Sequence, residues 1–125
     1  MDKKTFEVTA TIKVELTQED IDDIVAGALE GGITYWCCKA EVVGEYLGEY
    51  ASDQIARGGS LILYDNESDD KWELTLEKML TGIGLWLESG GCSALEDGKL
   101  DLCEVDGEAD DCIVQYALFG DVIFG

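Results

Sequence analysis

Apolar and polar residues alternate along the first part of the chain. Every second residue from Phe6 to Leu16 is apolar, and most residues between them are polar. This period of two predicts a half-buried strand. Thr17 and the polar, largely acidic residues 18–20 then predict a helix start, because Thr is a good N-cap and acids favour the first turn. Apolar residues recur at helical spacing up to Leu29, and we expect Gly31-Gly32 to end this helix in the left-handed conformation.

The middle of the chain predicts strands on either side of a short helix. Positions 33–43 are rich in β-branched and aromatic residues, which favours a strand. A helix is expected through Tyr50 and Ile55, ending at Arg57. Positions 60–64 and 72–75 then predict the two strands of a hairpin, joined by the acidic turn at 65–70.

The clearest helical pattern covers positions 76–88, where large apolar residues recur every three or four positions before Ser89 and two glycines. Gly82 and Gly84 lie inside this pattern. Each costs about 1 kcal/mol relative to Ala in a helix. Their presence indicates a close approach by another backbone or by a ligand.

The C-terminal third predicts a tight hairpin turn at Asp97-Gly98, a helix over 107–119 ended by Gly120, and an edge strand over 121–124. Acidic residues crowd the start of the last helix, where we expect them to be solvated, at positions 106, 108, 110 and 111. Strands and helices thus alternate without a linker or an internal repeat. The pattern predicts a single α+β domain over 1–125, with short strands and three to four helices.

Charge narrows the possible functions. The 125 residues include 28 Asp plus Glu and 8 Lys plus Arg, for a net charge of −20, with no His and no Pro. The absence of His excludes Ser-His-Asp and Cys-His catalysis and imidazole metal ligands. The negative charge disfavours direct binding to nucleic acid or to an anionic membrane. Hydrophobic residues make up 46% of the chain, which favours a folded domain over an acidic disordered tail.

The cysteines and the chain start predict a cytoplasmic protein. Five cysteines are present, at positions 37, 38, 92, 103 and 112, without a C-x-x-C pair. We expect all five to be reduced thiols, mostly filling the core, with Cys37 and Cys38 on opposite faces of a strand. No targeting signal and no apolar run of membrane-spanning length is found.

Two acidic stretches resemble the start of a calcium-binding loop, but both lack later ligands. After Asp65, Glu67 and Asp69 the sixth position is Asp70 instead of Gly, and the twelfth is Leu76 instead of Glu. The stretch that begins at Asp106 fails in the same way. We therefore expect no metal site, no cofactor and no enzymatic activity, because no nucleophile or phosphate-binding loop motif is present either.

Arg57 is the only Arg in the chain and precedes two glycines. A guanidinium can form bidentate contacts with phosphate, and Gly58 would allow backbone N–H groups to approach a ligand. The alternative is an Arg at a helix C-terminus that pairs with one of the many acids. Aromatic residues nearby, among them Trp36 and Tyr50, offer stacking surfaces for a base or, alternatively, core and interface material.

Four stretches together resemble a family of small phage proteins, the Thoeris anti-defence proteins of the first type. They are ITYWC at 33–37, VVGEYLGEYASDQIARGG at 42–59, LEKML at 76–80 and ADDCIVQYALFG at 109–120. The resemblance spans positions 33–125. It implies a protein that binds a cyclic ADP-ribose isomer made by a bacterial TIR-domain enzyme, and that withholds this signal from the defence effector without degrading it. It also implies binding of cyclic oligonucleotide signals by some members, and dimers that assemble into hexamers in the host cytoplasm.

The resemblance also implies ligand contacts. Arg57 would contact the pyrophosphate, with Gly58, Trp36 and Tyr50 nearby. An aromatic residue of the family is replaced here by Met79, which can cover an adenine face. An Asn ten residues later is replaced by Ser89, which can still form a hydrogen bond.

Two other function classes remain open on sequence alone. An acidic chain of this size suits a nucleic-acid mimic that inhibits a basic defence protein. The other class is a dimeric structural or adaptor protein that binds no small ligand.

Overall fold

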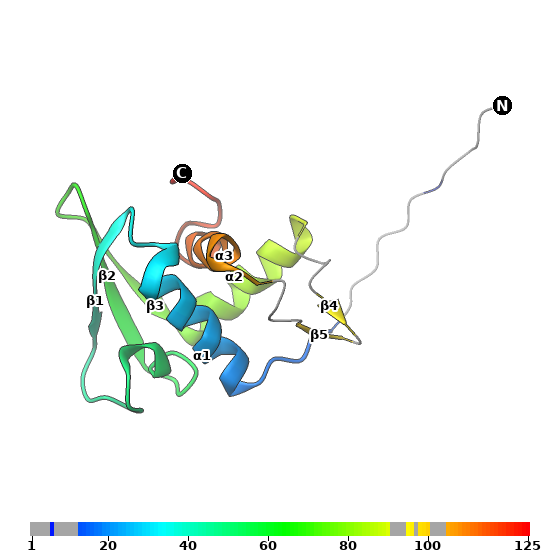
Figure 1. Ribbon diagram of the computed structural model, residues 1–125, viewed down its shortest axis with the longest axis horizontal. Coiled ribbons are helices and arrows are strands. Elements are labelled where there is room, and N and C mark those ends of the chain that lie inside the picture. Colours follow the sequence, from blue (N-terminus) through cyan, green and yellow to red (C-terminus); the bar gives the residue numbers. More distant parts are fainter. Residues whose placement is uncertain (1–5, 7–12, 91–94, 97, 101–104) are drawn as a thin grey trace.

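The computed structural model describes residue 6 and residues 13–90, 95–96, 98–100 and 105–125. Its architecture is α+β, as predicted (Figure 1). The N-terminal half holds α1 (Gln18–Gly27), a π-helical turn η1 (Ala28–Gly32), β1 (Cys37–Val42) and a 3₁₀ turn η2 (Ala51–Asp53). The C-terminal half holds β2 (Ser60–Asp65), β3 (Lys71–Thr75), α2 (Leu76–Glu88), β4 (Leu95–Glu96), β5 (Lys99–Leu100) and α3 (Gly107–Phe119).

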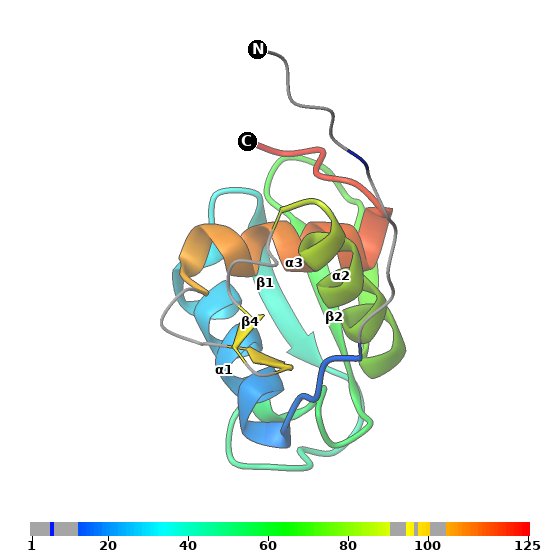
Figure 2. The same cartoon turned by 90° about the vertical axis from the view of Figure 1, so that its right-hand side faces the viewer.

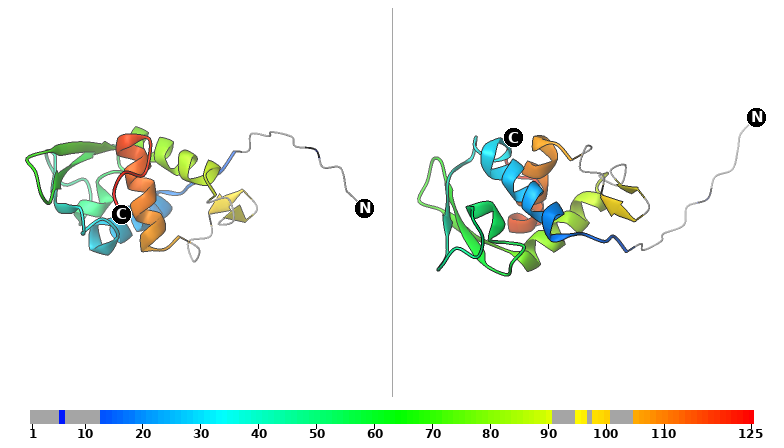
Figure 3. Two further views of the ribbon diagram at one scale, coloured as in Figure 1. Left: turned by 90° about the horizontal axis from the view of Figure 1, so that it is seen from above. Right: turned by 60° about the horizontal axis from the view of Figure 1, so that its bottom comes forward.

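The main sheet is antiparallel with strand order β1-β2-β3. Leu61 lies opposite Leu74 and Leu63 opposite Trp72, which confirms the predicted hairpin between β2 and β3. The β4–β5 pair forms a separate two-stranded sheet. Figures 1 and 3 show the main sheet at one end of the molecule, the three α-helices beside it, and the β4–β5 pair at the other end.

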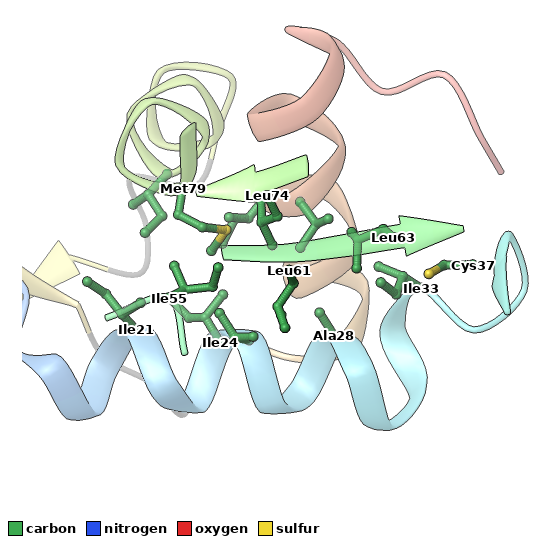
Figure 4. Close-up of a cluster of buried hydrophobic side chains, with 14 of the residues drawn as sticks. Ile21, Ile24, Ala28, Ile33, Cys37, Ile55, Leu61, Leu63, Leu74 and Met79 are labelled. Carbon is green, nitrogen blue, oxygen red and sulfur yellow. The ribbon is translucent and has the colours of Figure 1, made fainter. Parts of the chain in front are cut away.

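Alternation along β2 places apolar side chains on one sheet face. Leu61 and Leu63 are fully buried; Leu61 points toward Ile24 and Ala28 of α1, and Leu63 lies near Ile33 (Figure 4). Met79 of α2 completes this core beside Leu74. Burial of each such side chain contributes about 1.5–3 kcal/mol.

The predicted cap at Thr17 is confirmed, and the close approach predicted at Gly82 and Gly84 is confirmed at Gly82 but wrong at Gly84, where a Cβ would meet no described atom within 4 Å. Thr17 Oγ1 accepts a hydrogen bond from the Asp20 N–H at 3.0 Å, and Asp20 Oδ2 accepts one from the Thr17 N–H at 3.0 Å. Gly82 lets α2 and α3 pack closely, since a Cβ there would lie 2.6 Å from the Ile113 carbonyl oxygen. Figure 2 shows α3 crossing beside α2.

Three local predictions are wrong. Gly31 and Gly32 do not adopt the left-handed conformation, because α1 continues into the π-helical turn η1. The helix expected through Tyr50 is only the 3₁₀ turn η2. Residues 121–124 form no strand, because the N–H groups of Ile123 and Phe124 donate to the Gln115 side chain instead.

The cysteine predictions are confirmed in part. Cys37 is buried and Cys38 is exposed, so they do lie on opposite faces, but Cys38 does not fill the core. Cys37, Cys38 and Cys112 are free thiols. The predictions for Cys92 and Cys103, and most of the strand predicted over 6–16, fall outside the described residues. None of the described helices has the length and apolar character needed to cross a bilayer.

Candidate ligand-binding site

Arg57 follows η2 and is anchored to α1. Its Nη1 donates to Asp22 Oδ1 at 3.0 Å and to the Asp53 carbonyl oxygen at 2.8 Å. The side chain keeps 28% of its surface exposed. All hydrogen bonds from the guanidinium to the described residues use Nη1, so Nε and Nη2 keep their donors. The interpretation that Arg57 pairs with acids is thus confirmed, and its contact with an anion stays a prediction.

Gly58 contributes differently from the prediction. It has a φ of 88°, which favours glycine, and its N–H donates to the Ile55 carbonyl oxygen at 3.0 Å. The N–H is thus committed within the turn and does not contact a ligand in this conformation. Gly58 instead allows the chain to turn directly after Arg57.

Tyr50 is the N-cap residue of η2 and follows a loop whose residues 43–47 are exposed. Asp53 Oδ2 accepts from the N–H groups of Glu49 and Tyr50, both at 3.0 Å. The buried Gln54 side chain accepts from the Leu47 N–H at 3.0 Å, which holds the loop against the turn. Tyr50 is 62% exposed, and Leu47 is 50% exposed. This part of the chain presents aromatic and apolar surface next to Arg57 in sequence.

The remaining predicted contacts do not join Arg57 within one chain. Met79 is completely buried in the core and cannot cover a ligand there. Trp36 is 3% exposed, and its indole N–H donates to Asp111 at 2.8 Å. Ser89 is exposed at the end of α2, where its hydroxyl donates to the Trp86 carbonyl oxygen. Buried positions for Met79 and Trp36 are what their apolar volume favours.

A cavity that the sequence did not predict lies where α3 begins. Its volume is about 870 Å³. The walls come from the end of α1 and η1, the first turns of α3 and the C-terminal residues: Gly27, Glu30, Gly31, Gly32, Tyr35, Val105, Asp106, Gly107, Glu108, Asp110, Asp111, Cys112, Val122, Phe124 and Gly125. This lining includes several carboxylates and, among the described residues, no Lys or Arg.

Two of these acids are buried, so the prediction of solvated acids at this helix start is wrong for them. Asp111 is 8% exposed and accepts from the Tyr35 hydroxyl at 2.6 Å and from the Gln115 amide at 2.9 Å. Burial, and then the hydrogen bond to Asp111, raise the pKa of Tyr35 to about 12. Together with the Trp36 indole, these donors satisfy the Asp111 carboxylate.

Asp110 differs from its neighbour because one of its oxygens has no partner. The side chain is 4% exposed, and its buried Oδ1 makes no hydrogen bond with the described residues. Burial, with the charges of Asp106 and Asp23, raises the pKa of Asp110 to about 7. Gly27 accommodates the carboxylate, since a Cβ there would lie 2.0 Å from Asp110 Oδ2.

The C-terminal residues close one side of the cavity. Gln115 Oε1 accepts from the N–H groups of Ile123 and Phe124, both at 2.8 Å. The Phe124 ring stacks on Trp36 with centroids 4.9 Å apart and planes 6° apart. The same buried network thus fixes both the acids of α3 and the end of the chain.

Neither the surface around Arg57 nor the cavity at the start of α3 has, among the described residues, the side chains that would hold a metal ion. Among the described residues, no group of three or more Cys, Asp or Glu side chains is arranged to hold a metal ion. The searches with this chain found no matching protein-family model, no matching curated protein and no matching solved structure.

Proposed function

We propose that this chain is a phage counter-defence protein that binds a cyclic ADP-ribose-type signal in the host cytoplasm and sequesters it without degrading it. Cyclic oligonucleotide signals are a second ligand class within the same proposal. The residue pattern over positions 33–125, which resembles the Thoeris anti-defence proteins of the first type, supports it. So does the lack of His, which removes the usual acid–base catalyst.

The observation that carries the proposal is the state of Arg57. An anion that approaches a chain of net charge −20 needs a local cation with free donors. Arg57 is held by Asp22 and Asp53, so little side-chain entropy remains to be lost on binding. Its Nε and Nη2 can meet two phosphate oxygens in the side-on geometry that guanidinium groups favour.

The cavity beside α3 is a poor alternative for the pyrophosphate. Its carboxylates, among them Glu30, Asp106 and Glu108, would repel phosphate oxygens. We therefore assign the phosphates to the Arg57 side of the molecule and not to this cavity.

Tight sequestration requires more burial than the Arg57 surface offers in one chain. Nanomolar affinity corresponds to about −12 kcal/mol, which a small ligand reaches only when most of its surface is buried. Tyr46 is 60% exposed and Tyr50 is 62% exposed, which leaves aromatic surface for a second copy to cover. The proposal therefore includes a homodimer that closes the site and that assembles further into a hexamer.

The test is a release experiment. The protein is incubated with excess cyclic ADP-ribose isomer, freed of unbound ligand and heated, and the supernatant is analysed by liquid chromatography and mass spectrometry. We expect intact ligand at close to one molecule per site. Degraded ligand would instead identify an enzyme, and the absence of ligand after washing would reject the proposal.

The second candidate is an acidic nucleic-acid mimic. It is favoured by the excess of unpaired acids, since the ion pairs of the described residues involve only Asp22, Glu41 and Asp53 among the carboxylates. A mimic would bind a basic protein with an affinity that falls steeply between 50 and 500 mM salt, by screening. Ligand release at both salt concentrations, without such a partner, would favour the signal-binding function.

A further inference from the structure

We propose that the cavity at the start of α3 binds a small organic cation, an aliphatic amine of the polyamine class, with the Asp110 carboxylate as its counter-ion. This site is separate from Arg57, and the proposal does not depend on the nucleotide-binding function.

The first argument is the unpartnered oxygen. Asp110 is 4% exposed, lines the cavity, and has no hydrogen bond to its buried Oδ1 from the described residues. A buried acceptor without a partner costs about 1–3 kcal/mol. A donor that reached Oδ1 would remove this cost, and an ammonium group supplies a donor and a positive charge together.

The second argument is the sign of the charge. The charges of Asp23 of α1 and Asp106 at the start of α3 act on Asp110, and Glu30 of η1 and Glu108 and Asp111 of α3 also line the cavity. No described cation lines the cavity. A concave, partly apolar site with charge of one sign focuses the potential and concentrates counter-ions.

The third argument separates an amine from a metal ion. Val105, Val122 and Phe124 contribute apolar lining, whereas a hydrated metal ion needs oxygen ligands. The described residues also hold no three-ligand metal arrangement. An alkyl chain can cover these apolar groups while its ammonium end reaches Asp110.

Space for this ligand depends on glycine at two positions. Gly27 leaves room for the Asp110 carboxylate, and Gly32 lets η1 approach the Gly107 carbonyl oxygen, which a Cβ would meet at 2.7 Å. The cavity, of about 870 Å³, exceeds what a short diamine or triamine fills. Waters would occupy the remainder.

The test is calorimetric titration with spermidine at 150 mM NaCl, a salt concentration that screens diffuse binding to the acidic surface. We expect one saturable site, with at least tenfold weaker binding for Asp110→Asn. Asp69→Asn removes an equal charge from an exposed turn and should leave the affinity within twofold of the unsubstituted protein. Equal losses in the two variants, or no saturable site, would overturn the proposal.

A second measurement uses the unsubstituted protein, so that it does not depend on how the variant folds. The Asp110 carboxyl carbon is titrated by NMR with and without saturating spermidine. Because ligand binding favours the ionised form, we expect the pKa of Asp110 to fall by at least one unit from about 7. Spermidine affinity should accordingly rise from pH 6 to pH 8. An unchanged pKa, or a similar effect of 1,4-butanediol, which carries no charge, would contradict ammonium binding.

Discussion

The buried Asp110 carboxylate is expected to destabilise the fold at neutral and alkaline pH. Its pKa is raised from 3.8 to about 7 in the folded chain, so the folded state holds this proton more tightly than the unfolded state does. With 1.36 kcal/mol per pKa unit, the shift corresponds to roughly 4 kcal/mol between the fully protonated and fully ionised limits. This contribution of the bound proton to the free energy of unfolding is fully present below pH 4 and is lost progressively as the pH rises to about 7.

Asp110→Asn keeps the shape and removes the charge. Urea denaturation at pH 4 and pH 8, in the absence of amines, measures the free energy of unfolding of both proteins. We expect the variant to be more stable by up to about 4 kcal/mol at pH 8 and close to the unsubstituted protein at pH 4. Comparing the two proteins cancels the pH dependence of the other acids. Asp69→Asn, at an exposed position, should show no such pH-dependent difference. A variant that is equally stable or less stable at pH 8 would refute the reasoning about Asp110.

Four substitutions test other parts of the fold by urea denaturation. Gly82→Ala should lower the free energy of unfolding by about 1–3 kcal/mol, because the new Cβ would meet the α3 backbone. Gly84→Ala should raise it by about 1 kcal/mol, because no described atom lies within 4 Å of its Cβ. Equal effects of the two substitutions would contradict the close packing of α2 on α3. Thr17→Ala should cost about 1 kcal/mol by loss of the cap of α1, and a neutral result would show that this cap contributes nothing. Trp36→Phe should cost about 1–3 kcal/mol, because Asp111 loses a buried donor, and unchanged stability would argue against this network.

Regular elements were predictable because their patterns are local. The hairpin of β2 and β3, the limits of α2 and α3, and the cap at Thr17 follow from periodicity and from N-cap chemistry. The closeness of α2 and α3 at Gly82 was also indicated, since a glycine within a helix needs a packing reason.

The cavity was not predictable because its acids are buried through contacts distant in sequence. Asp110 and Asp111 follow the N-cap of α3, a position that ordinarily indicates solvated acids. Trp36 and Tyr35 bury Asp111 from 75 and 76 residues away. One signal was present in the sequence: Asp111 and Gln115 share a helix face with apolar neighbours, a placement that requires buried hydrogen-bond partners.

The residues proposed as ligand contacts differ in exposure. Met79 replaces a residue that the family resemblance places at the ligand, but an apolar side chain on the inner face of α2 packs into the core. Gly58 was expected to let backbone N–H groups approach a ligand, and its own N–H donates within the turn after η2. Arg57 pairs with acids, as one interpretation of its sequence position predicts, and its contact with a phosphate stays a prediction.

The most direct measurement is calorimetric titration of a cyclic ADP-ribose isomer into the unsubstituted protein, Arg57→Ala and Lys71→Ala. Both variants lose one positive charge, and Lys71 is exposed on β3, away from the proposed contact. We predict tight binding by the unsubstituted protein, more than tenfold weaker binding by Arg57→Ala, and less than twofold change for Lys71→Ala, with circular dichroism showing all three folded. Absence of binding by the unsubstituted protein, or equal affinity of the two variants, would contradict the proposed function and its assignment to Arg57.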